Sequence, residues 1–119
     1  MQTLKELSRE IAMWAVNNEL TDDYHSQSER PFMGMVEELG ELSHARLKRE
    51  QGIRGMVNTT TFMKAEQDAL ADLMIYWLHY CFMRRIDPDR LIMETWKKVK
   101  ERDWNKNKET GNADQSTGQ

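Results

Sequence analysis

Two acidic clusters are spaced along the chain so that a helical fold can bring them together. Glu37, Glu38 and Glu41 lie within the stretch VEELGELSHARLK, although like charges one helical turn apart repel each other. Asp68 and Asp72 are four residues apart, so on a helix they share one face. A lone carboxylate inside an apolar run is costly unless it is paired or bound to a cation. We therefore expect the two clusters to face each other across packed helices.

Carboxylate oxygens without cysteine favour a hard cation, which makes Mg²⁺ the expected metal, with Mn²⁺ as an alternative. The predicted metal ligands are Glu38, Glu41, Asp68 and Asp72. An ordinary solvated charged face would account well for Glu37. It accounts less well for Glu38, because that residue borders the apolar stripe of its predicted helix. Asp72 has an alternative as well, a salt bridge to Lys48, to Arg54 or to a base of a partner chain.

One motif in the sequence is typical of a second kind of metal centre, a di-iron site. Glu41 and His44 form a Glu-x-x-His pair, as used in di-iron carboxylate bundles. Such bundles need a second pair, and the candidate that ends at His79 has Tyr76 where a glutamate is required. The sequence therefore does not supply a di-iron site, and we expect His79 to be a core or interface histidine.

Four helices are predicted to position these residues. Thr3 and Glu6 fit a capping box, while Pro31 and Pro88 suit the first turns of later helices. The predicted helices run from residue 4 to about 18, from 31 to about 50, from the threonines at 59–61 to about 85, and from 88 to about 104. The second and third helices should pack antiparallel, joined by the connection at 51–60.

The third helix is apolar on nearly every side. Its stretch ALADLMIYWLHYCFM, residues 69–83, is interrupted by Asp72 and His79 alone. A helix that is apolar all round is expected to be buried all round, and a chain this short has few other helices to cover it. A second copy of the chain is the expected cover, with a central position in a larger monomeric bundle as the alternative. The residues expected in or near this interface are Trp77, Tyr80 and Cys81.

The chain has 119 residues, which allows a single core. We expect one helical domain over residues 1–105 and a polar, disordered tail over 106–119. A net charge of −3 argues against nucleic-acid or membrane-surface binding through charge alone. The first ten residues lack the pattern of a signal peptide, so a cytoplasmic location is expected. Cys81 is the one cysteine, and its apolar surroundings predict a buried, inert thiol.

The acidic motifs resemble those of the MazG-like all-α nucleotide pyrophosphohydrolases. EELGE at 37–41 matches the EExxE motif of that family, and DALADLMIYW at 68–77 resembles its second acidic motif. WKKVKERDW at 96–104 is similar to its basic C-terminal element, and residues 41–55 are similar to the connection of one MazG-like subgroup. The resemblance implies a four-helix bundle that forms a homodimer or a dimer of dimers. It also implies house-cleaning hydrolysis of a nucleoside triphosphate, NTP or dNTP, to the monophosphate and pyrophosphate with Mg²⁺.

The resemblance also implies roles for individual residues. Glu38 and Glu41 match the metal-binding glutamates, and Asp72 matches the aspartate of the second motif. Ala69 occupies the position where that motif normally has a glutamate. Either Asp68 substitutes with a shorter side chain, or the site holds fewer ions than is usual in the family.

Water activation and phosphate binding complete the predicted chemistry. Glu37 or Glu41 is placed to orient or deprotonate the attacking water. The candidate phosphate-binding residues are Lys48, Arg54, Lys98 and Arg102, whose alternative is a purely solubilising role. Because of Ala69, the competing hypothesis is a catalytically silent helical module that retains a nucleotide or metal site.

Overall fold

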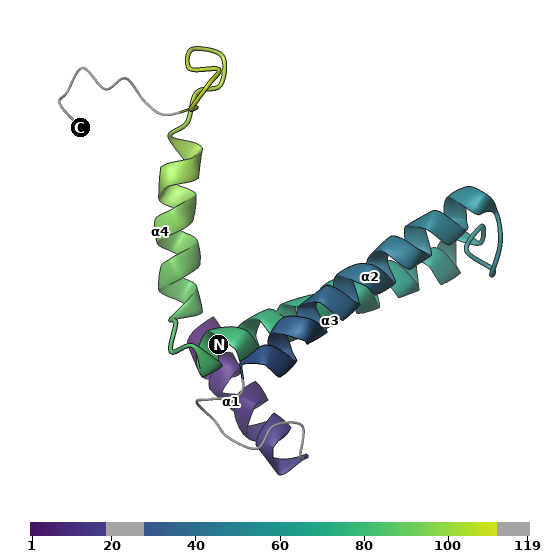
Figure 1. The fold of residues 1–119 in the computed structure, drawn as a ribbon, viewed down its shortest axis with the longest axis horizontal. Coiled ribbons are helices and arrows are strands. Elements are labelled where there is room, and N and C mark those ends of the chain that lie inside the picture. Colours follow the sequence, from purple (N-terminus) through teal and green to yellow (C-terminus); the bar gives the residue numbers. More distant parts are fainter. Residues whose placement is uncertain (19–27, 112–119) are drawn as a thin grey trace. The chain divides into compact units, whose positions relative to one another are not determined.

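The computed structural model describes residues 1–18 and 28–111, and within them the chain is all-α, as predicted. It has four helices (Figure 1), and no strand occurs in this part of the chain. The chain divides into two compact units, Met1–Pro88 and Asp89–Gln119. No helix in the described ranges has the length and hydropathy needed to cross a membrane.

The first helix, α1 (Leu4–Asn17), begins at the predicted capping box. The amide of Glu6 donates to Thr3 Oγ1 at 3.0 Å, and the amide of Thr3 donates to Glu6 Oε1 at 2.9 Å. Two backbone donors at the helix start are thereby satisfied. The buried face of α1 carries the small residues Ser8, Ala12 and Ala15, and α1 packs against the third helix.

Helices α2 (Glu29–Gln51) and α3 (Thr59–Met83) form a long antiparallel hairpin, as predicted (Figure 1). The turn between them uses Gly52, whose φ of 71° lies in the left-handed region that favours glycine. Asn58 then caps α3, because its side-chain oxygen accepts from the amide of Thr61 at 3.0 Å. The acidic motif on α2 is thereby folded back against the apolar stretch of α3.

The end of α3 differs slightly from the prediction, because a local motif stops the helix at Met83. Arg85 has a φ of 58°, and the amide of Ile86 donates to the carbonyl of Cys81 at 2.8 Å. This pattern satisfies carbonyls of the last turn and prevents the helix from continuing. The fourth helix, α4 (Pro88–Lys100), begins at the predicted proline and ends four residues before the predicted limit at 104.

The second unit continues after α4 into a hydrogen-bonded loop. The amide of Asp103 donates to the carbonyl of Gly111 at 2.8 Å, and Asp103 Oδ1 accepts from the amides of Asn105 and Lys106. Gly111 lies against the Trp104 ring with a φ of 71°. The predicted tail begins inside this loop, and its residues 112–119 lie outside the described residues.

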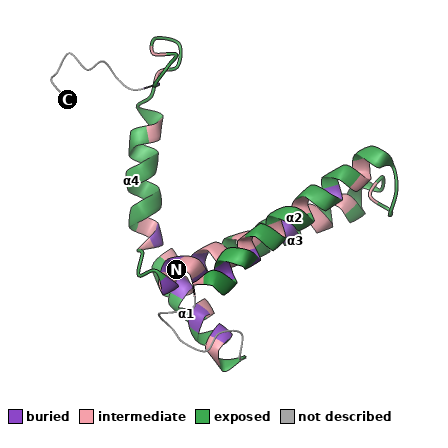
Figure 2. Ribbon diagram, viewed as in Figure 1, coloured by how far each residue is buried: buried purple, intermediate pink, exposed green. Residues whose placement is uncertain are grey.

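The buried side chains of the first unit gather where α1 meets α3 and along the facing sides of the hairpin (Figure 2). Near the end of α3 they include Leu78, Cys81 and Met83. Burial raises the pKa of the Cys81 thiol, in agreement with the predicted inert thiol. The expectation that α3 is covered on all sides is not met within one chain, because Leu70 and Met74 remain exposed.

Candidate functional site

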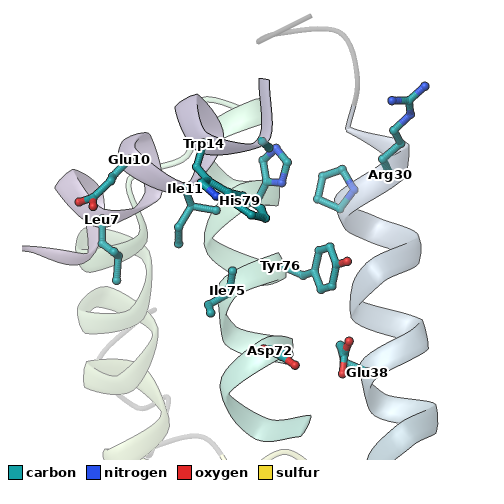
Figure 3. A pocket seen from close by; sticks show the side chains of 12 residues that line it. Leu7, Glu10, Ile11, Trp14, Arg30, Glu38, Asp72, Ile75, Tyr76 and His79 are labelled. Atoms are coloured by element: carbon teal, nitrogen blue, oxygen red, sulfur yellow. The ribbon is translucent and has the colours of Figure 1, made fainter. Parts of the chain in front are cut away.

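Glu38 of α2 and Asp72 of α3 face each other across the hairpin (Figure 3). We call these two residues the acidic pair. Both line a hollow of about 580 Å³ within the first unit. Partial burial raises the pKa of the Glu38 carboxyl, and the negative charges of Asp72, Glu37 and Glu41 raise it further. The hairpin therefore brings the two acidic motifs together at Glu38 and Asp72.

The other predicted carboxylates lie outside the hollow. Glu37 and Glu41 are exposed on α2, although their charges act on Glu38. Asp68 is 63% exposed and pairs with Lys64 Nζ at 3.3 Å. Within residues 1–18 and 28–111, no three or more His, Cys, Asp or Glu side chains are grouped so that they could hold a metal ion. The structure thus brings together two of the four predicted metal ligands.

The predicted phosphate-binding residues are not gathered around the acidic pair. Lys48 lies ten residues further along α2 than Glu38, a distance of about 15 Å along the helix. Arg54 belongs to the exposed turn beyond the end of α2. Lys98 and Arg102 belong to the second unit and are not among the residues that line this hollow. Their predicted role stays a prediction.

Tyr76 fills the space between α2 and α3 next to the acidic pair (Figure 3). Its ring lies so close to Gly34 that a Cβ on that glycine would be 2.6 Å from the ring carbon Cζ. Burial raises the pKa of the Tyr76 hydroxyl, and so do the charges of Glu37, Glu38 and Asp72. The hydroxyl therefore stays protonated at neutral pH and can donate a hydrogen bond.

His79 lies in the wall of the same hollow, two helical turns beyond Asp72. The residue is 5% exposed, and Nε2 has no hydrogen-bond partner in the described part of the chain. Burial lowers the pKa of the imidazole below its ordinary value of 6.5, so the ring is neutral at pH 7. Buried polar atoms are normally paired, which makes this nitrogen an exception.

The remaining wall of the hollow is largely apolar. It is contributed mainly by α1 and by the start of α2. These lining residues are Leu7, Glu10, Ile11, Trp14, Ala15, Arg30 and Pro31, joined by Ile75 from α3. One signal was present in the sequence: Asp72, Tyr76 and His79 recur at helical spacing, so they lie on one face of α3. The packing of α1 against that face had no such signal.

Comparisons of this chain with known protein families, with curated proteins and with solved structures found no match. The resemblance to the MazG-like pyrophosphohydrolases therefore rests on the motifs at 37–41, 68–77 and 96–104. The geometry adds a hollow in which a carboxylate from each of the first two motifs meets aromatic and apolar walls. Such a hollow can take a ligand that has a flat apolar part and an anionic, cation-binding part.

Proposed function

We propose that this protein is a Mg²⁺-dependent nucleotide pyrophosphohydrolase that converts an NTP or dNTP to the monophosphate and pyrophosphate. The observation that carries the proposal is the acidic pair at one end of a largely apolar hollow. The volume, about 580 Å³, falls in the range of small-molecule sites. Carboxylates suit the cation that accompanies a triphosphate, and apolar walls suit a base.

The acidic pair fits Mg²⁺ without a complete cage of protein ligands. Mg²⁺ in phosphate-processing sites commonly keeps several waters and is held through one or two carboxylates together with substrate phosphates. Glu38 and Asp72 would supply those two carboxylates. Burial and, after it, the neighbouring negative charges raise the pKa of Glu38, and a bound cation would relieve the repulsion between those charges. When bound, Mg²⁺ would neutralise phosphate charge and lower the pKa of an attacking water.

The neighbouring glutamates are proposed to handle the proton of that water. Glu41 lies one helical turn from Glu38, and Glu37 precedes it directly. Both side chains are exposed on α2, and a carboxylate of this kind can act as a general base. The phosphate-binding roles of Lys48, Arg54, Lys98 and Arg102 remain predictions.

Assembly into a homodimer or a dimer of dimers is part of the proposal. Helix α2 buries Ala45 against the rest of the hairpin. On its opposite side, about 180° around the helix from Ala45, it exposes a stripe of large apolar side chains. This α2 stripe consists of Val36, Leu39 and Leu47. Exposed apolar patches of this kind mark protein interfaces, and a second copy of the hairpin would cover it. The interface predicted on α3 is the alternative: Trp77 and Tyr80 are half-buried there, whereas Cys81 is buried within the chain.

A second candidate function is a catalytically silent module that binds a nucleotide or a metal. Ala69, at the position of the missing glutamate, is buried at 4% exposure. Asp68 points outward to Lys64 instead of taking over that position. The second motif therefore contributes one carboxylate to the hollow, and this favours a site with fewer ions than the family uses.

Pyrophosphate release from a panel of NTPs and dNTPs with Mg²⁺ tests the proposal. We expect the wild type to release pyrophosphate, and Glu38→Gln and Asp72→Asn to lose that activity by orders of magnitude. Asp68→Asn is the matched control on α3 and should remain close to the wild type. Nucleotide binding without pyrophosphate release would favour the silent module, and absence of both would exclude the two functions.

A further inference from the structure

His79 lines the hollow near Trp14 and Ile75 (Figure 3), and the residue is 5% exposed. Its buried Nε2 has no hydrogen-bond partner among residues 1–18 and 28–111. A buried nitrogen of this kind is costly to leave unpaired, so a ligand group that pairs with it would gain affinity.

The position of His79 along α3 sets what such a ligand must look like. His79 lies seven residues from Asp72, which corresponds to about 10 Å along the helix. Between them, Ile75 and Tyr76 line the hollow, and Trp14 of α1 adds a second large aromatic side chain. A matching ligand has a flat uncharged ring near His79 and its anionic groups about 10 Å away, at the acidic pair. A nucleotide has this layout, with the base at one end and the phosphates at the other.

We propose that His79 is a specificity-determining residue that reads the base: Nε2 makes one hydrogen bond with the edge of an uncharged nucleobase lying in the apolar part of the hollow. This inference rests on the proposed function, because it deepens the substrate recognition of the same site. A neutral imidazole offers one donor and one acceptor nitrogen, so the partner is a ring carbonyl or an amino group. A purely apolar occupant would leave Nε2 unpaired.

Binding of the base can be measured apart from hydrolysis. We would titrate the wild type, His79→Phe and His79→Gln with nucleoside monophosphates carrying different bases, with Mg²⁺ present, by calorimetry. Phenylalanine keeps a flat ring but removes the hydrogen bond, whereas the glutamine amide can replace it. We expect His79→Phe to lose roughly tenfold to a hundredfold in affinity for the preferred base and its preference among bases. His79→Gln should recover part of that affinity.

Inorganic tripolyphosphate with Mg²⁺ is the matched probe of the acidic pair alone. Its affinity should be unchanged in His79→Phe and reduced in Glu38→Gln. A His79→Phe protein with wild-type affinity and wild-type base preference would overturn the inference, and so would a wild type that binds no nucleoside monophosphate. If base binding depends on His79 but no pyrophosphate is released, the inference stands and the proposed enzymatic activity fails.

A measurement on the unmodified protein covers the case in which a substitution prevents folding. With ¹⁵N-labelled histidine, the Nε2 resonance of His79 should shift when the preferred nucleoside monophosphate is added. Tripolyphosphate with Mg²⁺ should leave that resonance in place. A resonance that ignores the monophosphate at saturation would overturn the inference.

Discussion

At the scale of single residues, Glu38 is a carboxylate whose surroundings disfavour its negative charge. Its pKa is raised by burial and by the charges of Asp72, Glu37 and Glu41. A raised folded-state pKa means that the folded protein holds this proton more tightly than the unfolded chain does. Glu38 therefore costs stability increasingly as the pH rises from 4.5 through the folded-state pKa.

The first prediction is that Glu38→Gln separates stability from activity. In EDTA at pH 7 the variant should melt at or above the wild-type temperature, because one member of a like-charged cluster is gone. Mg²⁺ should raise the melting temperature of the wild type more than that of the variant, and pyrophosphate release should fall by orders of magnitude. Thermal melting with EDTA and then with Mg²⁺, beside the release assay, measures all three.

Glu41→Gln is the companion variant and should change the melting temperature and the activity in the same directions. Its rise in melting temperature in EDTA should be smaller, because Glu41 is the smallest of the causes that raise the pKa of Glu38. A structural salt bridge predicts the opposite, because removing an acid would leave a base unpaired. If the variants melt at a lower temperature in EDTA and keep full activity, these glutamates have a structural role and no catalytic one.

The second prediction concerns the pH dependence that His79 adds to folding. Burial lowers its folded-state pKa below the ordinary 6.5, so below that pH the unfolded chain takes up a proton that the folded protein resists. The contribution of His79 to the free energy of unfolding is complete above pH 6.5 and is lost as the pH falls toward the folded-state pKa. Denaturant unfolding at pH 7.5 and 5.5 should show a larger acid loss in the wild type than in His79→Gln. Equal losses would show that the imidazole is solvated.

At the scale of the elements, the hairpin depends on a glycine that lets α2 approach α3. Gly34 and Gly40 both lie on α2, but only at Gly34 would a Cβ meet the Tyr76 ring; at Gly40 nothing lies within 4 Å. The third prediction is that Gly34→Ala destabilises the fold by about 1–3 kcal/mol through overpacking. Gly40→Ala should be neutral or stabilising by up to about 1 kcal/mol, because alanine favours a helix.

Chemical denaturation of the two glycine variants checks that pair. Because both variants make the same change in the same helix, intrinsic helix propensity cancels in the comparison. If the two alanine variants were equally stable, Tyr76 would have room to move away, and the close contact would not hold the hairpin in register.

The elements were largely predictable because their signals are local. The capping box at Thr3, the proline that opens α4 and the glycine turn at residue 52 each act within a few residues. The outward position of Asp68 was harder to predict from the sequence. It depends on how α3 rotates against α2, and burial of Ala69 turns Asp68, about 100° away around the helix, toward solvent and Lys64.

The candidate site was predictable in its carboxylates and not in its walls. Glu38 and Asp72 were identified because a charge beside an apolar stripe needs a reason, although Asp72 is exposed in the structure and not buried within its apolar run. The contribution of Trp14 and the unpaired state of His79 depend on where α1 packs, which no short-range pattern specifies. The same limit applies to the basic residues, since a lysine on a helix gives no sign of what lies opposite.

At the scale of the whole molecule, the α2 stripe is an apolar surface that the described residues of the first unit leave uncovered. Val36 and Leu39 are 58% and 57% exposed in the middle of a long helix, on the side away from Ala45. A typical stable interface buries about 800 Å² on each partner. Covering the stripe with the same stripe of a second copy makes a closed, two-fold contact.

The fourth prediction is that the wild type has at least twice its chain mass of 14.1 kDa in solution and that a charge in the α2 stripe reduces it. Leu39→Lys would place an ammonium group in the centre of the contact, where burying it unpaired is costly, so light scattering at micromolar concentration should report a lighter species. Met13→Lys, at an exposed apolar residue of α1, is the control and should keep the wild-type mass. A wild type that is monomeric at that concentration would contradict the proposed assembly. If Leu39→Lys kept the mass of an oligomeric wild type, the interface would lie elsewhere. The exposed Leu70 and Met74 of α3 would then be the next surface to test.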